Sequence, residues 1–145
     1  MNNSAGFTLA ELVVTIVLVG IIAATAIPTF NNVVVSTQLQ INLSNMEIIK
    51  NAFVRYYFVT QNDPPPVPEN NLLDSEYKDL VLPDGRTPDN LFNGKDGLPY
   101  NSNGNPYSYY YESDTSETQF ITKKITIKDM DLDSPSYEEF VIGEI

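Results

Sequence analysis

The 145-residue chain contains no cysteine, no histidine and no tryptophan. Without cysteine it cannot form a disulfide framework. The lack of histidine excludes histidine-based metal sites, Ser–His and Cys–His nucleophile systems, and histidine general bases. No glycine-rich phosphate loop and no G-x-S-x-G pattern is present. The sequence therefore gives no basis for an enzyme.

Basic residues are also scarce, with 8 Lys and Arg against 19 Asp and Glu, for a net charge of −11. Residues 1–60 hold two acids and two bases, which cancel, so residues 61–145 carry the whole net charge. Such a surface repels nucleic acid phosphates and has no basic patch to bind them. It suits a solvated extracytoplasmic domain, or one that binds divalent cations.

The most prominent feature of the sequence is the apolar stretch Gly6–Ile27, which carries one charged residue, Glu11. As a helix, its roughly 21 residues would be about 30 Å long, which is the thickness of the hydrocarbon core of a bilayer. A charged residue at the middle of a membrane helix costs about 2.5–3.5 kcal/mol on insertion scales. Glu11 lies one turn into the run, where the cost is lower, but the acid still needs a partner.

The start of this stretch follows a specific pattern. A short polar leader ends in Gly6, followed by Phe7, then Thr8-Leu9, then Glu11 as the fifth residue counted from Phe7. This pattern, at the head of an apolar helix containing Pro28, resembles the amino-terminal signature of type IV pilins and of the pseudopilins of type II secretion systems. Farther along, Gly104–Tyr109 is similar to the G-N-P-Y-x-Y segment that opens the sheet of major pseudopilins.

The resemblance implies a processing and assembly pathway. A prepilin peptidase would cut between Gly6 and Phe7 and N-methylate Phe7, and Glu11 would pair with the terminal amine of a neighbouring subunit. An anion and a cation attract strongly in a low-dielectric layer. The implied partners are copies of the chain, other pilin-like subunits, the peptidase and the inner-membrane assembly platform.

Two other readings of the stretch compete with this one. The first is a secretory signal peptide cleaved after Ala24-Thr25-Ala26, which would leave a soluble protein beginning at Ile27. It fits poorly, because the leader has no positive charge and the apolar run opens with an acid. The second is a plain single-pass anchor that never assembles. Because Met1–Ala5 contain neither Lys nor Arg, flanking charge does not predict the orientation.

Beyond Ile27 the sequence predicts that the same helix continues to about Thr60, for a total of about 50 residues. Pro28 removes one helical hydrogen bond and should bend the helix where the apolar run ends. From Asn31 the pattern is amphipathic, with polar residues such as Asn42 mostly off the apolar stripe. The stripe is made of Leu39, Leu43, Met46, Ile49, Phe53 and Tyr56. The neighbourhood of Phe53, Tyr56, Tyr57 and Phe58 is expected to anchor a core.

The helix must stop before Asp63–Pro68 because three prolines in a row cannot continue it. A short helix is predicted over Leu72–Leu80, followed by a turn-rich connection. Strands are predicted over Tyr107–Tyr111, Gln119–Lys128 and Tyr137–Ile142. An antiparallel sheet laid over the second half of the helix would bury both apolar faces, which gives a pilin-like α+β fold.

The expected divisions are a leader (1–6), a transmembrane and assembly half of the helix (7–30), its amphipathic half (31–60), a linker and loop region (61–106) and the sheet of a globular head (107–145).

One acidic cluster, Asp129, Asp131 and Asp133, has ligand-like spacing. Acids at alternate positions resemble the start of a calcium loop, but Ser134 replaces the glycine that an EF-hand requires. An irregular calcium site is one reading, and the calcium site in the sheet loops of major pseudopilins supports it. The other reading is a strand end with solvated acids. No cofactor is expected to be required, and calcium is the one candidate.

The sequence thus favours a structural subunit of a helical filament. The resemblance places it in the bacterial inner membrane before assembly and in a periplasmic or extracellular filament afterwards. The filament would be a type IV pilus for adhesion or motility, or a pseudopilus for type II protein secretion. The alternative is a membrane-anchored or secreted acidic binding domain that does not assemble.

Overall fold

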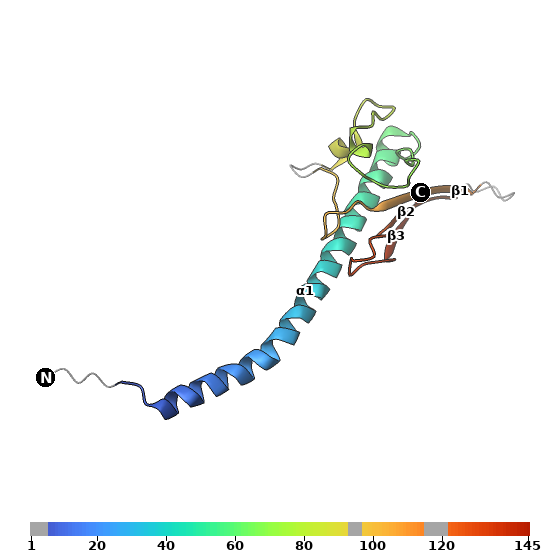
Figure 1. Cartoon of the computed structure of the whole chain (residues 1–145). Coiled ribbons are helices and arrows are strands. Elements are labelled where there is room, and N and C mark those ends of the chain that lie inside the picture. Colours follow the sequence, from blue (N-terminus) through green and yellow to red (C-terminus); the bar gives the residue numbers. More distant parts are fainter. Residues whose placement is uncertain (1–5, 93–96, 115–121) are drawn as a thin grey trace. The chain divides into compact units, whose positions relative to one another are not determined.

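The computed structural model of the chain describes residues 6–92, 97–114 and 122–145. It consists of one long helix, α1 (Leu9–Thr60), and three strands, β1 (Ser108–Asp114), β2 (Thr122–Lys128) and β3 (Phe140–Glu144) (Figure 1). This α+β, pilin-like layout confirms the predicted fold class. The chain divides into two compact units, residues 1–37 and 38–145, which are described separately below.

The first unit is the amino-terminal part of α1. Every described residue from Gly6 to Thr37 is exposed. The most apolar 18-residue window of α1 has a mean hydropathy of 2.5, which is enough to cross a membrane by length and composition. Pro28 lies inside the helix, and α1 continues on both sides of it. The hydroxyl of Thr29 donates to the carbonyl of Thr25 at 3.1 Å in this region.

The second unit, the head, contains the rest of α1 and the sheet. The strands are antiparallel in the order β1-β2-β3, with Tyr109 opposite Ile127 and Ile127 opposite Val141. Helix and sheet bury their facing side chains, and the rings of Phe53 and Tyr109 meet edge to face with centroids 4.9 Å apart. Gly143 of β3 allows this close packing, because a Cβ there would lie 3.0 Å from Lys50 and Val54 on α1.

The end of α1 has a specific local cause. Gln61 has a left-handed φ of 58°, and its backbone N–H donates to the carbonyl of Tyr57 at 2.9 Å. This single bond closes the last turn in the manner of a left-handed C-terminal cap. The prolines that begin at Pro64 follow. The predicted end of the helix at about Thr60 is therefore confirmed.

Three local predictions were wrong. The predicted helix over Leu72–Leu80 is absent, and only Tyr77–Asp79 forms a 3-10 turn. The chain before that turn pairs with the sheet instead, because Tyr109 donates to the carbonyl of Asn71 and Leu73 donates to that of Tyr107. Phe58 is 58% exposed and does not belong to the core.

The third wrong prediction is the start of the last strand, which begins at Phe140 instead of Tyr137. Glu138 takes a left-handed φ of 66°, and its N–H donates to the carbonyl of Asp129 at 2.8 Å. That turn delays the strand by three residues. The predicted middle strand began at Gln119, and its residues 119–121 lie outside the described part of the chain.

Candidate functional site: the amino-terminal segment and a polar cluster

The segment around Glu11 is built by the residues that begin α1. The Glu11 Oε2 atom accepts the backbone N–H of Thr8 at 2.9 Å and the Thr8 hydroxyl at 2.8 Å. In return, the Thr8 Oγ1 atom accepts the backbone N–H of Glu11 at 3.2 Å. This reciprocal pattern is a capping box, in which a Thr and a Glu three residues later satisfy each other's free N–H groups at a helix start.

The capping box gives Glu11 a partner within its own chain. The sequence analysis assigned Glu11 only a partner on a neighbouring subunit and missed this local one, although the T-x-x-E spacing of Thr8 and Glu11 is visible in the sequence. The carboxylate is held at the backbone N–H of Thr8, just before α1 begins. Phe7, the residue before Thr8, is 84% exposed. Gly6 is exposed as well. Both residues of the expected Gly6–Phe7 cleavage point are therefore exposed.

The three predicted calcium ligands are only partly brought together. Asp129 and Asp131 share the side-chain amide of Asn101, which donates to them at 3.3 and 2.9 Å. Asp133 is exposed, and its backbone N–H donates to Asp131 at 3.2 Å. Within residues 6–92, 97–114 and 122–145, no group of three acids, histidines or cysteines is placed to hold a metal ion.

The donors around these acids do not suit a cation at the same place. The Asn101 Oδ1 atom accepts the N–H groups of Asn103 and Asn105 at 3.0 and 2.8 Å, which fixes the amide so that its Nδ2 faces the aspartates. A calcium site needs oxygen ligands. As arranged, the cluster satisfies its carboxylates with hydrogen bonds, and calcium at Asp129, Asp131 and Asp133 stays a prediction.

Asp131 is held by amides from one loop. The side-chain amides of Asn105, Asn103 and Asn101 donate to its Oδ2 atom at 3.0, 2.8 and 2.9 Å. These hydrogen bonds, led by that of Asn105, lower the pKa of the Asp131 carboxyl to about 2. Asp131 therefore stays ionised and ties the loop before β1 to the loop after β2.

The second half of the cluster is buried and reaches α1. Asp129 is fully buried, and its Oδ2 atom accepts the hydroxyls of Ser134 and Ser136 at 2.6 and 2.5 Å. The Asn42 amide nitrogen lies 3.0 and 2.8 Å from the same two hydroxyls, and its Oδ1 atom accepts the N–H of Ser102 at 2.7 Å. Asn42 was expected on the polar side of α1 but is fully buried. It connects the helix to both loops.

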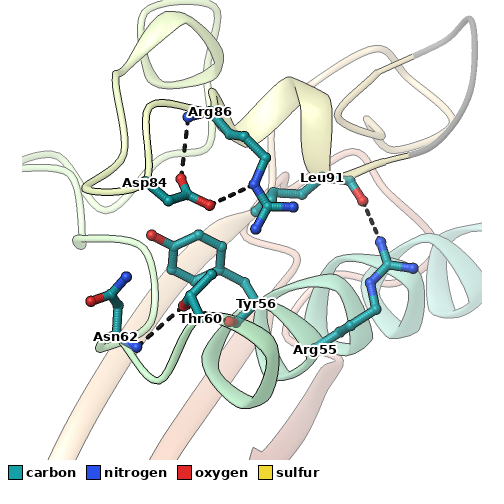
Figure 2. Close-up of polar contacts among 7 residues, drawn as sticks. All are labelled: Arg55, Tyr56, Thr60, Asn62, Asp84, Arg86 and Leu91. Carbon is teal, nitrogen blue, oxygen red and sulfur yellow. Dashed lines mark hydrogen bonds and ion pairs between the residues drawn. The ribbon is translucent and has the colours of Figure 1, made fainter.

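A second polar contact lies near the carboxyl end of α1 and is shown in Figure 2. Arg86 forms an ion pair with Asp84, with Nε and Oδ2 2.5 Å apart, and its guanidinium lies 5.5 Å from the centre of the Tyr56 ring. Arg55, on the same helix as Tyr56, instead donates from Nη2 to the carbonyl of Leu91 at 2.7 Å. These contacts hold residues 84–91 against the head part of α1.

Comparison with known proteins bears on the amino-terminal segment. Residues 1–27 match the family model of the prokaryotic N-terminal methylation motif, the signature of type IV pilins and pseudopilins. The chain carries a prepilin-type signal. No curated protein and no solved structure matches the chain significantly. The prepilin-type signal marks the chain as a pilin-like substrate of prepilin peptidase, and it favours a structural subunit over an enzyme.

The prepilin-type signal includes the exposed, apolar start of α1. The motif ends at Ile27, which is also the last residue of the apolar stretch. The helix in this segment has no described side chain buried against the rest of the chain. An apolar helix with this signal fits anchoring in the inner membrane.

Proposed function

We propose that the chain is the structural subunit of a type IV pilus or of a type II secretion pseudopilus. Prepilin peptidase cleaves it between Gly6 and Phe7 and methylates the new amine of Phe7. The stretch Phe7–Ile27 holds it in the inner membrane, and the helix then bundles with copies of itself as a filament. Pro28 marks the point where the helix leaves the apolar layer.

The observation that supports this function best is the match of residues 1–27 to the methylation motif on an exposed apolar helix. A helix apolar on all sides is stable in lipid or among other apolar helices. The same surface therefore serves both states, membrane and filament. Identical subunits added head to tail without a closing rotation give an open filament.

The capping box suggests how Glu11 takes part in assembly. In the free subunit its carboxylate is satisfied by Thr8. Hydrogen bonds to a charged group contribute about 1.5–3 kcal/mol. A full cation 4 Å away contributes about 4 kcal/mol at an effective dielectric of 20. The two bonds from Thr8 together are thus comparable to the pairing with a cation, and both end on Oε2. Glu11 therefore binds the amine of a neighbouring Phe7 through Oε1 and keeps its helix cap.

The first experiment is mass spectrometry of the amino terminus of the protein recovered from cells. A chain that begins at Phe7 and is one methyl group heavier supports the proposal. A chain that begins at Ile27 contradicts it and indicates a secreted acidic domain. A chain that begins at Met1 indicates an anchor that is not processed.

The second experiment separates the two roles of Glu11. Glu11→Ala should stay in the membrane and lose filaments. Glu11→Gln is the matched control, since glutamine keeps the capping box but not the charge. We expect Glu11→Gln to lose filaments as well, because pairing needs the anion. Normal assembly of Glu11→Ala contradicts the pairing role and favours the non-assembling anchor. If Glu11→Gln assembles normally and Glu11→Ala does not, assembly does not need the charge, and the role of Glu11 is to cap the helix.

A further inference from the structure

The head has an open groove of about 790 Å³ beside α1. One wall is a face of the helix on which Asn45, Ile48 and Arg55 follow each other at helical spacing. The other wall is the segment from Leu98 to Tyr100. Ile48 is 47% exposed although it lies in the groove. The groove is therefore an apolar surface that the rest of the described head leaves uncovered.

The groove is held open by specific contacts. The Asn45 side-chain amide donates to the carbonyl of Tyr100 at 2.9 Å. The N–H of Leu98 donates to the Asp89 Oδ1 atom at 2.9 Å, and Gly97 before it has a φ of 61°. A Cβ at Gly97 would lie 2.0 Å from that same oxygen, so a larger residue there would displace the Asp89 carboxylate that holds Leu98. The wall is thus built into the fold and available before any partner arrives.

The groove carries positive charge in a strongly acidic protein. Its described lining contains Arg55 and no Asp or Glu, whereas the chain as a whole has a net charge of −11. Arg55 is exposed, and one of its donors bonds the Leu91 carbonyl (Figure 2). Within the described residues it forms no ion pair, unlike Arg86. A guanidinium has five N–H donors, so Arg55 retains donors for an external carboxylate.

The same head presents a segment with the complementary character, Met130–Asp133, which we call the knob. Leu132 is 76% exposed and Met130 is 41% exposed. Asp133 beside them is also exposed. The knob is held in place because Asp131 is fixed by three amides and the N–H of Ser134 donates to the Asp131 carbonyl at 2.9 Å. It offers an apolar side chain followed by a carboxylate.

We propose that the knob of one copy docks in the groove of the next copy, with Leu132 against Ile48 and Asp133 on Arg55. This inference rests on the proposed filament function and names a head contact within it. The two surfaces are different, so the contact is heterologous. A docked pair then keeps one free knob at one end and one free groove at the other, so further copies add as an open filament when the rotation between copies does not close a ring.

The chain has no cysteine, so a pair of introduced cysteines reports this contact without background. The full-length double variant Ile48→Cys with Leu132→Cys, oxidised in isolated filaments, should give a ladder of disulfide-linked oligomers beyond the dimer. The matched control is Ile48→Cys with Val81→Cys, because Val81 is 70% exposed and lies outside the knob. The control pair should give no ladder.

The possible results distinguish a failure of the proposed filament function from a failure of the docking proposal. If the unmodified chain forms no filaments, the proposed function fails. If filaments form but the Ile48–Leu132 pair gives no ladder, or only dimers, the docking proposal is overturned and the function stands. Cross-links to a different, acidic protein in place of a ladder would also overturn it, since the groove would then serve another partner.

Charge reversal gives an independent test. Arg55→Glu and Asp133→Arg should each lower filament yield by about two- to fivefold, which is the size expected for one exposed ion pair. The double variant should restore the yield. Glu112→Arg, an exposed acid on β1 outside the knob, is the control and should leave the yield unchanged. Additive losses in the double variant contradict the pairing of Arg55 with Asp133.

Discussion

The two parts of α1 share one secondary structure but differ in what surrounds their side chains. In the head, Met46, Ile49 and Phe53 are fully buried against the sheet and loops. In the first unit, Ile16 and Ile22 are 60% and 66% exposed, like their neighbours. Burying one large apolar side chain contributes about 1.5–3 kcal/mol. The head obtains this stabilisation from its own chain, whereas the described apolar side chains of the first unit have no such partner within the chain.

This difference shows that the sequence determines helix formation and the burial of the helix side chains separately. Capping at Thr8 and the near absence of helix breakers produce the helix in both parts. The arrangement of polar residues along the helix determines whether it has one buried face and one exposed face. From Asn31 onward polar side chains alternate with an apolar stripe, and within the apolar stretch Gly6–Ile27 they do not.

The largest effect should come from separating the two parts. A chain of residues 38–145 keeps the compact unit with its core and loses the apolar helix. We expect it to stay entirely in the supernatant when membranes are pelleted and to unfold in one cooperative transition, as single domains of this size usually do. Pelleting with membranes would show that the head itself binds them, and unfolding without a cooperative transition would show that the fold of the head depends on the first unit.

The second largest effect should come from the core of the head. Phe53→Ala removes a fully buried ring that contacts Tyr109, and it should lower the free energy of unfolding by about 3–5 kcal/mol. Phe58→Ala is the matched control on the same helix, because Phe58 is 58% exposed. Its effect should stay within about 0.5 kcal/mol. Denaturant unfolding of both variants measures the difference, and equal losses would contradict this division of α1.

The buried polar cluster should have an intermediate effect. Asn42→Ala leaves the hydroxyls of Ser134 and Ser136 without their amide donor and should cost about 1–3 kcal/mol. Asn51→Ala, at an exposed position of the same helix, should cost little. Both are measured by denaturant unfolding. If the two variants are equally stable, Asn42 does not connect the helix to the loops in the way described.

These residues also show how far the sequence predicts the structure. The helix, its end and the sheet follow from periodicity and from proline positions, which are local signals. The burial of Asn42 does not, because its partners Ser102 and Ser134 lie 60 and 92 residues away in sequence. A polar residue whose partners are distant has the same local pattern as a solvated one. The late start of β3 depends on the left-handed Glu138, which residue preference disfavours.

The candidate site divides in the same way. Gly6, Phe7 and Glu11 lie in a continuous motif that the sequence displays directly, and the capping box was visible there as T-x-x-E. The surroundings of Asp129 and Asp131 come from loops about 30 residues apart that meet only in the fold. Acid spacing alone could not show that Asn101 presents its amide N–H groups to them.

A smaller effect concerns the pH dependence of the stability of the head. The folded-state pKa of Asp131 is about 2, below the value of about 3.9 for an unfolded aspartate. Its contribution to stability is therefore fully present above about pH 4 and is lost as the pH falls towards 2. Thermal unfolding of the 38–145 chain should show this loss, and Asp131→Asn should show a weaker one. An identical pH profile in the variant would contradict the role of the three amides.

The smallest effect is expected from calcium. Since the Asp129 and Asp131 carboxylates already accept hydrogen bonds and Asn101 faces them with N–H groups, a cation would have to displace these donors. We expect the Tm of the 38–145 chain to be the same with excess Ca²⁺ and with a chelator. A rise in Tm with Ca²⁺ that disappears in Asp133→Asn would instead establish the calcium hypothesis. The loops would then have two arrangements, one held by amides and one by the ion, and assembly through the adjacent knob would depend on which is populated.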